Sequence, residues 1–243
     1  DVDADTFNMD SESLKRAIAL IKSHGDLKPR AIMTVDLFGG VADYDSIRAV
    51  AAESGLKVIA DAAQSFGASL HGKRVGSLAD VTATSFYPTK PLAAWGDGGA
   101  IFTDDADLAE VIRSIRVHGS GTKGKYDNVR VGTNSRLQTL QAVVLLEKLK
   151  IFEEELALRQ KVVARYLEGL DPRISPQAVQ ADSQGAWALY TIKLKARDEV
   201  ARHLKDRGVP TGVYYPRPLH IQAPYRDFPV APGGLPVTDQ LKD

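Results

Sequence analysis

The 243-residue sequence contains no cysteine and carries no net charge, since 31 Lys and Arg residues balance 31 Asp and Glu residues. Without cysteine there is no disulfide framework, no thiolate metal ligand and no cysteine nucleophile. Balanced charge argues against a surface for nucleic acid or anionic membrane, which would show a basic excess. No apolar run approaches the ~18 residues of a membrane span, and no signal peptide is visible. These absences predict a soluble, cytoplasmic globular protein.

Several catalytic and binding motifs are also missing. Gly119 to Lys125 matches G-x-x-x-x-G-K, but Tyr126 stands where a phosphate-binding loop needs Ser or Thr. No G-x-G-x-x-G follows a strand candidate, and no G-x-S-x-G motif exists for a serine hydrolase. The five histidines show no metal-ligand spacing, so no metal site is predicted.

What is present in the first half is an alternation of short apolar runs and helical patterns. Ala31–Val35 and Lys57–Ala60 read as strands, with a helical pattern between them that ends at Gly55. Strand, helix, strand at this length is a βαβ unit, and continuous apolar strands predict a sheet covered on both faces. Two further strands are expected over Val81–Phe86 and Gly99–Thr103, followed by a helix that Gly119 ends. The fold class is α/β.

The second half predicts one long helix from about Ser135 to Leu170, because apolar residues keep a 3.6 period along it. A strand over Trp187–Leu194 and a helix over Arg197–Arg207 follow, before a Pro-rich tail. A helix that long usually links two bodies. We therefore expect a larger domain over residues 1–150 and a smaller one over 151–243.

Three side chains are candidates for chemistry. Asp61 directly follows an apolar strand, where ligands bind in open α/β sheets, although a helix N-cap is an equally good interpretation. Lys90 lies between Pro88 and Pro91 in an apolar stretch, and such desolvation would lower its pKa as a nucleophilic amine requires; an ordinary solvated lysine is the alternative. Ser85, at a strand end, offers a hydrogen bond to an anion.

The segment GDGG, residues 96–99, is either a hairpin turn or a place where backbone closely approaches a ligand. An Asp after one strand, a Ser after another and a nearby Lys together suit pyridoxal phosphate. In such a site the Lys holds the cofactor as an imine, and the Asp keeps the pyridine nitrogen protonated so that the ring acts as an electron sink.

With these residues the sequence resembles the DegT/DnrJ/EryC1/StrS family of nucleotide-sugar aminotransferases. The blocks DAAQSFGA, TSFYPTKPLAAWGDGGAIFT and VGTNSRLQTLQA carry the resemblance, which runs over nearly the whole chain. It implies fold type I, with a three-layer αβα large domain and a smaller α+β C-terminal domain. The run from NSRLQTLQA through KIFEEELALRQKV is most similar to enzymes that aminate a UDP-linked 3-keto-N-acetylhexosaminuronic acid.

The resemblance assigns a role to each matching position. Lys90 would form the imine with pyridoxal 5'-phosphate, Asp61 would pair with the pyridine nitrogen, and Ser85 would hold the phosphate. Gln64 would lie against the ring and its 3-hydroxyl. Asn134 would reach the phosphate of the neighbouring subunit's cofactor, which implies a homodimer with shared sites. Substrate-side residues would be Arg136 and His220, and the closest subgroup does not always keep a histidine at the latter position.

The implied reaction is ping-pong transamination from L-glutamate to a nucleotide-linked keto sugar, in lipopolysaccharide or other surface-polysaccharide precursor synthesis. The resemblance also implies that an upstream segment with part of the cofactor's cradle is absent, and that the chain stops before the family's last strand and helix. Two alternatives remain: a non-catalytic regulatory or binding member of the family, and a pyridoxal-phosphate-dependent sugar dehydratase. Lys90 weighs against the second, because the family's dehydratases carry histidine there.

Overall fold

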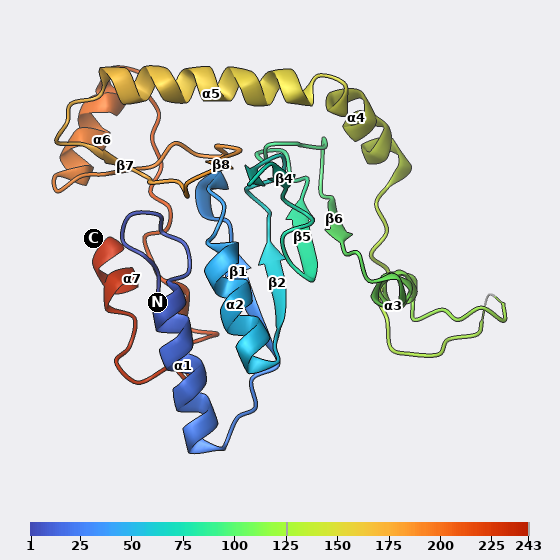
Figure 1. Ribbon diagram of the computed structural model, residues 1–243. Helices are drawn as coiled ribbons and strands as arrows, with labels where there is room; N and C mark the ends of the chain where they lie inside the picture. The colour runs from blue at the N-terminus through green and yellow to red at the C-terminus, as the bar shows by residue number, and fades with distance from the viewer. Residues whose placement is uncertain (125, 243) are drawn as a thin grey trace.

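A four-stranded sheet organises the computed structural model, which describes residues 1–124 and 126–242 (Figure 1). The strand order is β1-β2-β5-β6. The first three strands are parallel, β6 is antiparallel to β5, and their bounds are Ala31–Val35 (β1), Lys57–Asp61 (β2), Val81–Ser85 (β5) and Gly99–Phe102 (β6). All four strands predicted from apolar runs are confirmed.

Two helices build the core on one face of this sheet. Helix α2 (Tyr44–Ser54) begins at Asp43, whose carboxylate accepts the Ser46 N–H at 3.1 Å, and ends at Gly55. Its apolar side, with Ile47 fully buried, joins Ile32 and Val58 in one cluster. Helix α1 (Ser11–His24), which the sequence analysis did not identify, packs against α2 (Figure 1).

The opposite face of the sheet is open in the described part of the chain. Burial alternates strictly along β1, where Met33 is 62% exposed and Ile32 only 4%. The prediction of a sheet covered on both faces is therefore wrong for these residues. Its basis was the continuous apolar character of the strands, but no described helix packs on the side of Met33 and Val35.

The predicted long helix is divided in two. Helix α4 (Thr139–Leu149) and helix α5 (Phe152–Gly169) meet at residues 150 and 151. There the N–H groups of Lys150 and Ile151 donate to carbonyls three residues back, which tightens the last turn of α4. The 3.6 period continues through this break, so apolar spacing alone could not reveal it.

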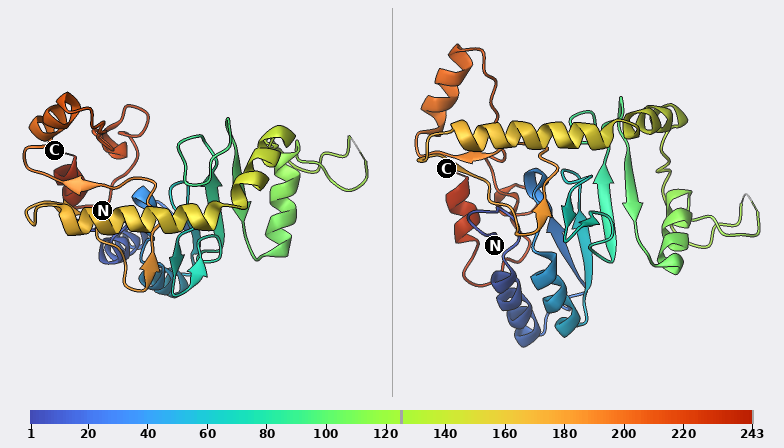
Figure 2. Two further views of the ribbon diagram at one scale, coloured as in Figure 1. Left: turned by 90° about the horizontal axis from the view of Figure 1, so that it is seen from above. Right: turned by 45° about the horizontal axis from the view of Figure 1, so that its top comes forward.

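Helix α5 lies across the carboxyl ends of the parallel strands (Figures 1 and 2). Phe152 and Leu156 on its first turns are 3% and 4% exposed. The Phe152 ring lies 5.5 Å from that of Phe66, which belongs to the loop after β2. This packing closes one side of the edge where the candidate residues lie.

The remaining elements are short. They are η1 (Leu37–Gly39), β3 (Ser69–Leu70), β4 (Lys73–Arg74), α3 (Ala106–Arg116), β7 (Ser175–Pro176), β8 (Ser183–Gln184), β9 (Ile192–Lys193), α6 (Arg197–Asp206), η2 (Leu219–Ile221) and α7 (Pro236–Leu241). The predicted helices after Asp105 and over 197–207 are confirmed. No helix in the described residues has both the length and the apolar character needed to cross a membrane.

The strand predicted over Trp187–Leu194 forms only at Ile192–Lys193. Trp187 adopts a left-handed φ of 50°, which a strand does not accommodate. The N–H groups of Ala186 and Leu189 donate instead to the carbonyls of Gly39 and Phe38, at 2.9 and 3.2 Å. Backbone bonding to the loop after β1 thus replaces most of the predicted strand.

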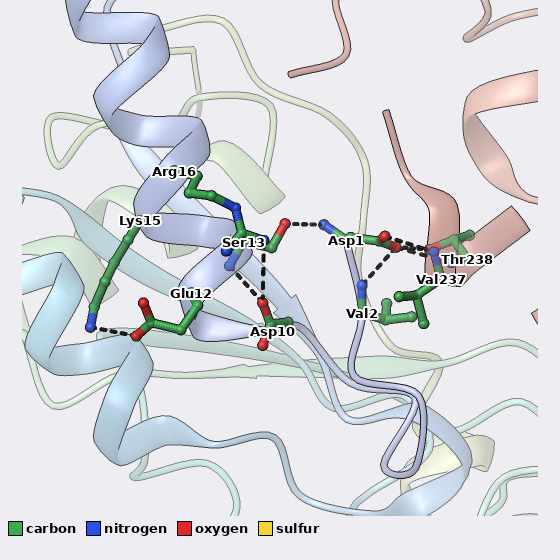
Figure 3. Close-up of polar contacts among 9 residues, drawn as sticks. All are labelled: Asp1, Val2, Asp10, Glu12, Ser13, Lys15, Arg16, Val237 and Thr238. Carbon is green, nitrogen blue, oxygen red and sulfur yellow. Dashed lines mark hydrogen bonds and ion pairs between the residues drawn. The ribbon is translucent and has the colours of Figure 1, made fainter. Parts of the chain in front are cut away.

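The first residues of the chain lie between α1 and α7 (Figure 3). The Asp1 carboxylate accepts the N–H groups of Val237 and Thr238 at 2.9 and 3.0 Å, and the Asp1 amino group donates to Ser13 Oγ. Asp10 caps α1, since its carboxylate accepts the Ser13 N–H at 2.6 Å. Burial lowers the pKa of the Asp1 amino group.

Removing the α1 cap is expected to destabilise the chain. In Asp10→Ala the Ser13 N–H loses its acceptor, and the free energy of unfolding should fall by about 1 kcal/mol. Urea unfolding followed by circular dichroism measures this. Asp26→Ala is the matched control, because Asp26 is an exposed aspartate beyond the other end of the same helix. Equal effects of the two substitutions would contradict the cap's role.

Candidate active site

Polar side chains gather where the three parallel strands end. Asp36 follows β1, Asp61 ends β2 and Ser85 ends β5. The Asp36 N–H donates to the Asp61 carbonyl at 3.0 Å, so the ends of β1 and β2 are joined. Asp61 is in register with Ala83, which places Ser85 two residues further along the same edge. The carboxyl edge of an open α/β sheet is the usual place for a ligand.

Asp61 is free to meet a ligand. No α-helix follows it: residues 63–67 form turns, so the helix N-cap interpretation is wrong. One carboxylate oxygen accepts the Ala63 N–H at 3.0 Å, which orients the side chain. In the described part of the chain this carboxylate, which is partly exposed, forms no ion pair.

Gln64 lies in the turn after Asp61 and is 9% exposed. Its amide oxygen accepts the Phe38 N–H at 2.6 Å, and its amide nitrogen lies 3.4 Å from the Tyr215 hydroxyl. The side chain is therefore held between the loop after β1 and the C-terminal segment. Its predicted contact with a cofactor ring stays a prediction.

Lys90 closes a turn that begins at the end of β5. Its N–H donates to the Tyr87 carbonyl at 2.9 Å, while the Tyr87 N–H donates to Ser85 Oγ at 3.2 Å. These two hydrogen bonds fold residues 85–90 into a turn at the end of β5. Of the large apolar residues in this stretch, Phe86 and Leu92 are buried, whereas Tyr87 and Trp95 are 50% and 79% exposed. Lys90 itself is half-buried.

The GDGG segment lines a pocket of about 400 Å³. The pocket lies between this segment and residues Ser135–Gln138 with Gln141. A side chain at Gly98 would meet Leu137, and one at Gly99 would meet the Thr84 carbonyl. The glycines are thus needed for close approach, and the last of them opens β6 opposite Ser85.

Arg136 lies on the far side of that pocket, next to Asn134. Arg136 lines it and donates from Nε to Asn134 Oδ1 at 3.0 Å, while the backbone of Asn134 bridges Val117 after α3. His220 in η2 lies elsewhere: its Nε2 is 3.3 Å from the Asp239 carboxylate in α7. Since α3 and α7 lie on opposite sides of the sheet (Figures 1 and 2), one chain does not bring His220 together with Arg136.

Asp36 is the residue of this edge that sequence reasoning missed. It is fully buried, and burial raises the pKa of its carboxyl to about 6, with a further contribution from the charge of Asp61. The signal that singled out Asp61, an aspartate directly after an apolar strand, applies equally to Asp36 after AIMTV.

Comparisons with known proteins show which family the chain resembles. The model of the DegT/DnrJ/EryC1/StrS aminotransferase family matches residues 1–243. The chain is 46% identical over 241 residues to a UDP-2-acetamido-2-deoxy-3-oxo-D-glucuronate aminotransferase of Pseudomonas aeruginosa, covering 99% of this chain and 64% of that protein. A pleiotropic regulatory protein of Geobacillus stearothermophilus is 40% identical over 99% of this chain and 63% of its own length. The crystal structure of a DegT DnrJ EryC1 StrS aminotransferase from Brucella abortus superposes with a TM-score of 0.97 at 48% identity, covering 100% of this chain and 65% of that one. The chain therefore spans just under two thirds of the length of these relatives.

Proposed function

The chain belongs to the DegT/DnrJ/EryC1/StrS aminotransferase family, and on that premise we propose that it transfers the amino group of L-glutamate to a keto group of a nucleotide-linked sugar. The observation that carries the proposal is the placement of Asp61, Ser85 and Lys90 at one edge of the sheet. A UDP-linked 3-keto-hexosaminuronic acid is the favoured acceptor, because the Pseudomonas aeruginosa relative is named for that sugar. The setting would be cytoplasmic synthesis of lipopolysaccharide or other surface-polysaccharide precursors.

Pyridoxal 5'-phosphate is the proposed cofactor, and the residues present fit it. Asp61 offers a cationic ring nitrogen a carboxylate that forms no ion pair within the described residues, and such a charge-assisted bond is among the stronger hydrogen bonds. Ser85 would bind the phosphate, Gln64 would lie against the ring, and Lys90 would bind the cofactor's aldehyde carbon. Bound there, pyridoxal phosphate supplies a sink for the electron pair left when a carbon–hydrogen bond is broken.

The work of the chain's own residues is to hold groups and move a proton. With glutamate bound, the free amine of Lys90 would take the proton from the α-carbon of the amino acid and hold it for transfer to the adjoining carbon. Asp61 would keep the ring nitrogen protonated. With the keto sugar bound, Lys90 would carry a proton in the opposite direction, to the sugar carbon that receives the amino group.

A homodimer with shared sites is part of the proposal. Arg136 lines the pocket beside GDGG and donates a hydrogen bond to Asn134, and we assign Asn134 to the phosphate and Arg136 to the sugar of a partner subunit's site. His220 is assigned to the substrate side. We further propose a larger α/β domain over 1–150, in which the described helices cover one face of the sheet, and a smaller α+β domain over 151–243, with the boundary between α4 and α5.

A second candidate is a regulatory role without catalysis. It is favoured by the 40% identity to the pleiotropic regulatory protein of Geobacillus stearothermophilus. The two candidates differ in what glutamate does. In a transaminase, glutamate changes the absorbance of the bound cofactor and releases 2-oxoglutarate, whereas a regulator leaves both unchanged.

Covalent trapping tests the proposed function. We expect borohydride reduction of the protein incubated with pyridoxal phosphate to attach the cofactor to Lys90, because an amine at this edge lies where the ring would bind. Peptide mass spectrometry identifies the labelled lysine. Prior addition of glutamate should prevent the labelling. A label spread over surface lysines, unaffected by glutamate, would show that Lys90 is not the anchoring amine.

A further inference from the structure

Asp36 is a buried carboxylate that the proposed mechanism does not use. It is 0% exposed and accepts three hydrogen bonds. The Ala42 N–H and the Tyr44 hydroxyl donate to Oδ1 at 2.9 and 3.0 Å, and the Ser65 hydroxyl donates to Oδ2 at 2.6 Å. These donors come from the start of α2 and from the loop after β2, so one side chain joins both segments to the end of β1.

The loop that Asp36 holds carries the candidate cofactor residues. Ser65 follows Gln64 directly, and the Asp36 N–H donates to the Asp61 carbonyl. The loop after β1 is itself constrained, since Phe38 adopts a left-handed φ of 63° while its N–H donates to Gln64. A non-glycine residue keeps this conformation only where its surroundings over-determine it. Asp36 and Phe38 thus hold the Asp61–Ser65 loop in place through hydrogen bonds from the end of β1 and the loop after it.

Keeping Asp36 ionised costs stability. Burial raises the pKa of its carboxyl from 3.8 to about 6, although all three hydrogen bonds lower it, and the charge of Asp61 raises it further. Because the folded pKa exceeds the unfolded one, the folded chain loses stability as pH rises from about 4 to about 6. A neutral side chain could accept these hydrogen bonds without the cost of burying a charge. We therefore look for a function that requires the negative charge of Asp36.

We propose that Asp36 is a positioning residue for the site at Asp61. Its ionised carboxylate holds the Asp61–Ser65 loop in place and sets a second negative charge behind Asp61. Two carboxylates repel each other until a cation lies against the outer one, so Asp36 favours a protonated ring nitrogen at Asp61. This inference rests on the proposed function. It explains why Asp36 is ionised although burying its charge costs stability.

The test measures the affinity for pyridoxal phosphate as a function of pH. Tryptophan fluorescence detects binding during the titration. Asp36→Asn keeps the shape and removes the charge, and we expect affinity at pH 8 to fall about tenfold. Wild-type affinity should also weaken as pH falls through about 6, where Asp36 takes up a proton. Asp36→Asn should lack this step. Asp43→Asn is the matched control, since Asp43 caps α2 nearby and should change affinity less than about twofold.

Ser65→Ala gives a second readout that does not depend on Asp36→Asn folding. The Ser65 hydrogen bond lowers the pKa of Asp36, so its loss should move the pH midpoint of cofactor affinity upward. A merely structural anchor would weaken stability without moving this midpoint. If the wild-type protein binds and both variants match it in affinity and pH profile, the Asp36 proposal fails while the proposed function stands. A wild-type protein that takes up no pyridoxal phosphate overturns both.

Discussion

Replacing Lys90 with alanine is expected to slow the glutamate half-reaction by about 10³-fold or more. The substitution removes the amine that would anchor the cofactor and carry the proton between the α-carbon and C4′. Neither Asp61 nor Ser85 can substitute for it, because an ionised carboxylate and a hydroxyl form no imine. Stopped-flow absorbance after mixing the cofactor-loaded protein with glutamate measures the rate.

Folding and cofactor uptake need separate controls in this experiment. Lys73→Ala is the matched control: Lys73 is an exposed lysine in β4, and its loss should leave the half-reaction unchanged. Lys90 is half-buried, so Lys90→Ala should change the free energy of unfolding by less than about 1 kcal/mol. A Lys90→Ala protein that still converts glutamate to 2-oxoglutarate at the wild-type rate would remove Lys90 from the mechanism.

Substituting Gly39 with alanine is expected to destabilise the fold by about 3 kcal/mol. Gly39 has φ +100°, and an added Cβ would lie 2.6 Å from the Trp187 backbone nitrogen and 2.8 Å from that of Ala188. Backbone cannot yield as a flexible side chain would. The Gly39 carbonyl also accepts the Ala186 N–H at 2.9 Å, so the clash would separate the loop after β1 from the second half of the chain. Chemical denaturation gives the size of the loss.

Gly55→Ala separates the two causes of this loss. Gly55 has φ +67° at the end of α2, with no atom within 4 Å of an added Cβ, so it bears only the left-handed backbone penalty of about 1 kcal/mol. The excess of Gly39→Ala over Gly55→Ala therefore measures the close approach. Gly39→Ala should also weaken cofactor binding, because Gln64 contacts the same loop through Phe38. If both substitutions lower the free energy of unfolding equally, the close approach of Gly39 to Trp187 does not contribute to the loss.

The strands and most helices of this chain could be predicted because their signals are local. AIMTV and KVIAD are short branched runs bounded by turn residues, and Gly55 marks the end of α2. Asp10 before Ser11–His24 is an equally local cap signal, so α1, although not predicted above, also has a signal in the sequence. The two-helix division at residues 150 and 151 carries no such signal.

The sequence was enough to predict which residues form the candidate site, but not which of their neighbours are buried. Asp61, Ser85 and Lys90 follow from the rule that ligands bind at the carboxyl edge of parallel strands. The exposure of Trp95 and the burial of Leu92, three residues apart, depend on which side of the Lys90 turn meets the core. Periodicity does not determine that in a segment without regular structure.

By itself the sequence determined the α/β class, the family and the order of chemistry-bearing residues along the chain. Each of these depends on neighbours within a few residues, where backbone preference and apolar spacing act. Only the tertiary structure decided that Asp36 would be buried against Tyr44 and Ser65, that Arg136 would line a pocket beside GDGG, and that His220 would pair with Asp239. Those contacts join segments far apart in sequence, so their burial and charge follow from packing that no local pattern records.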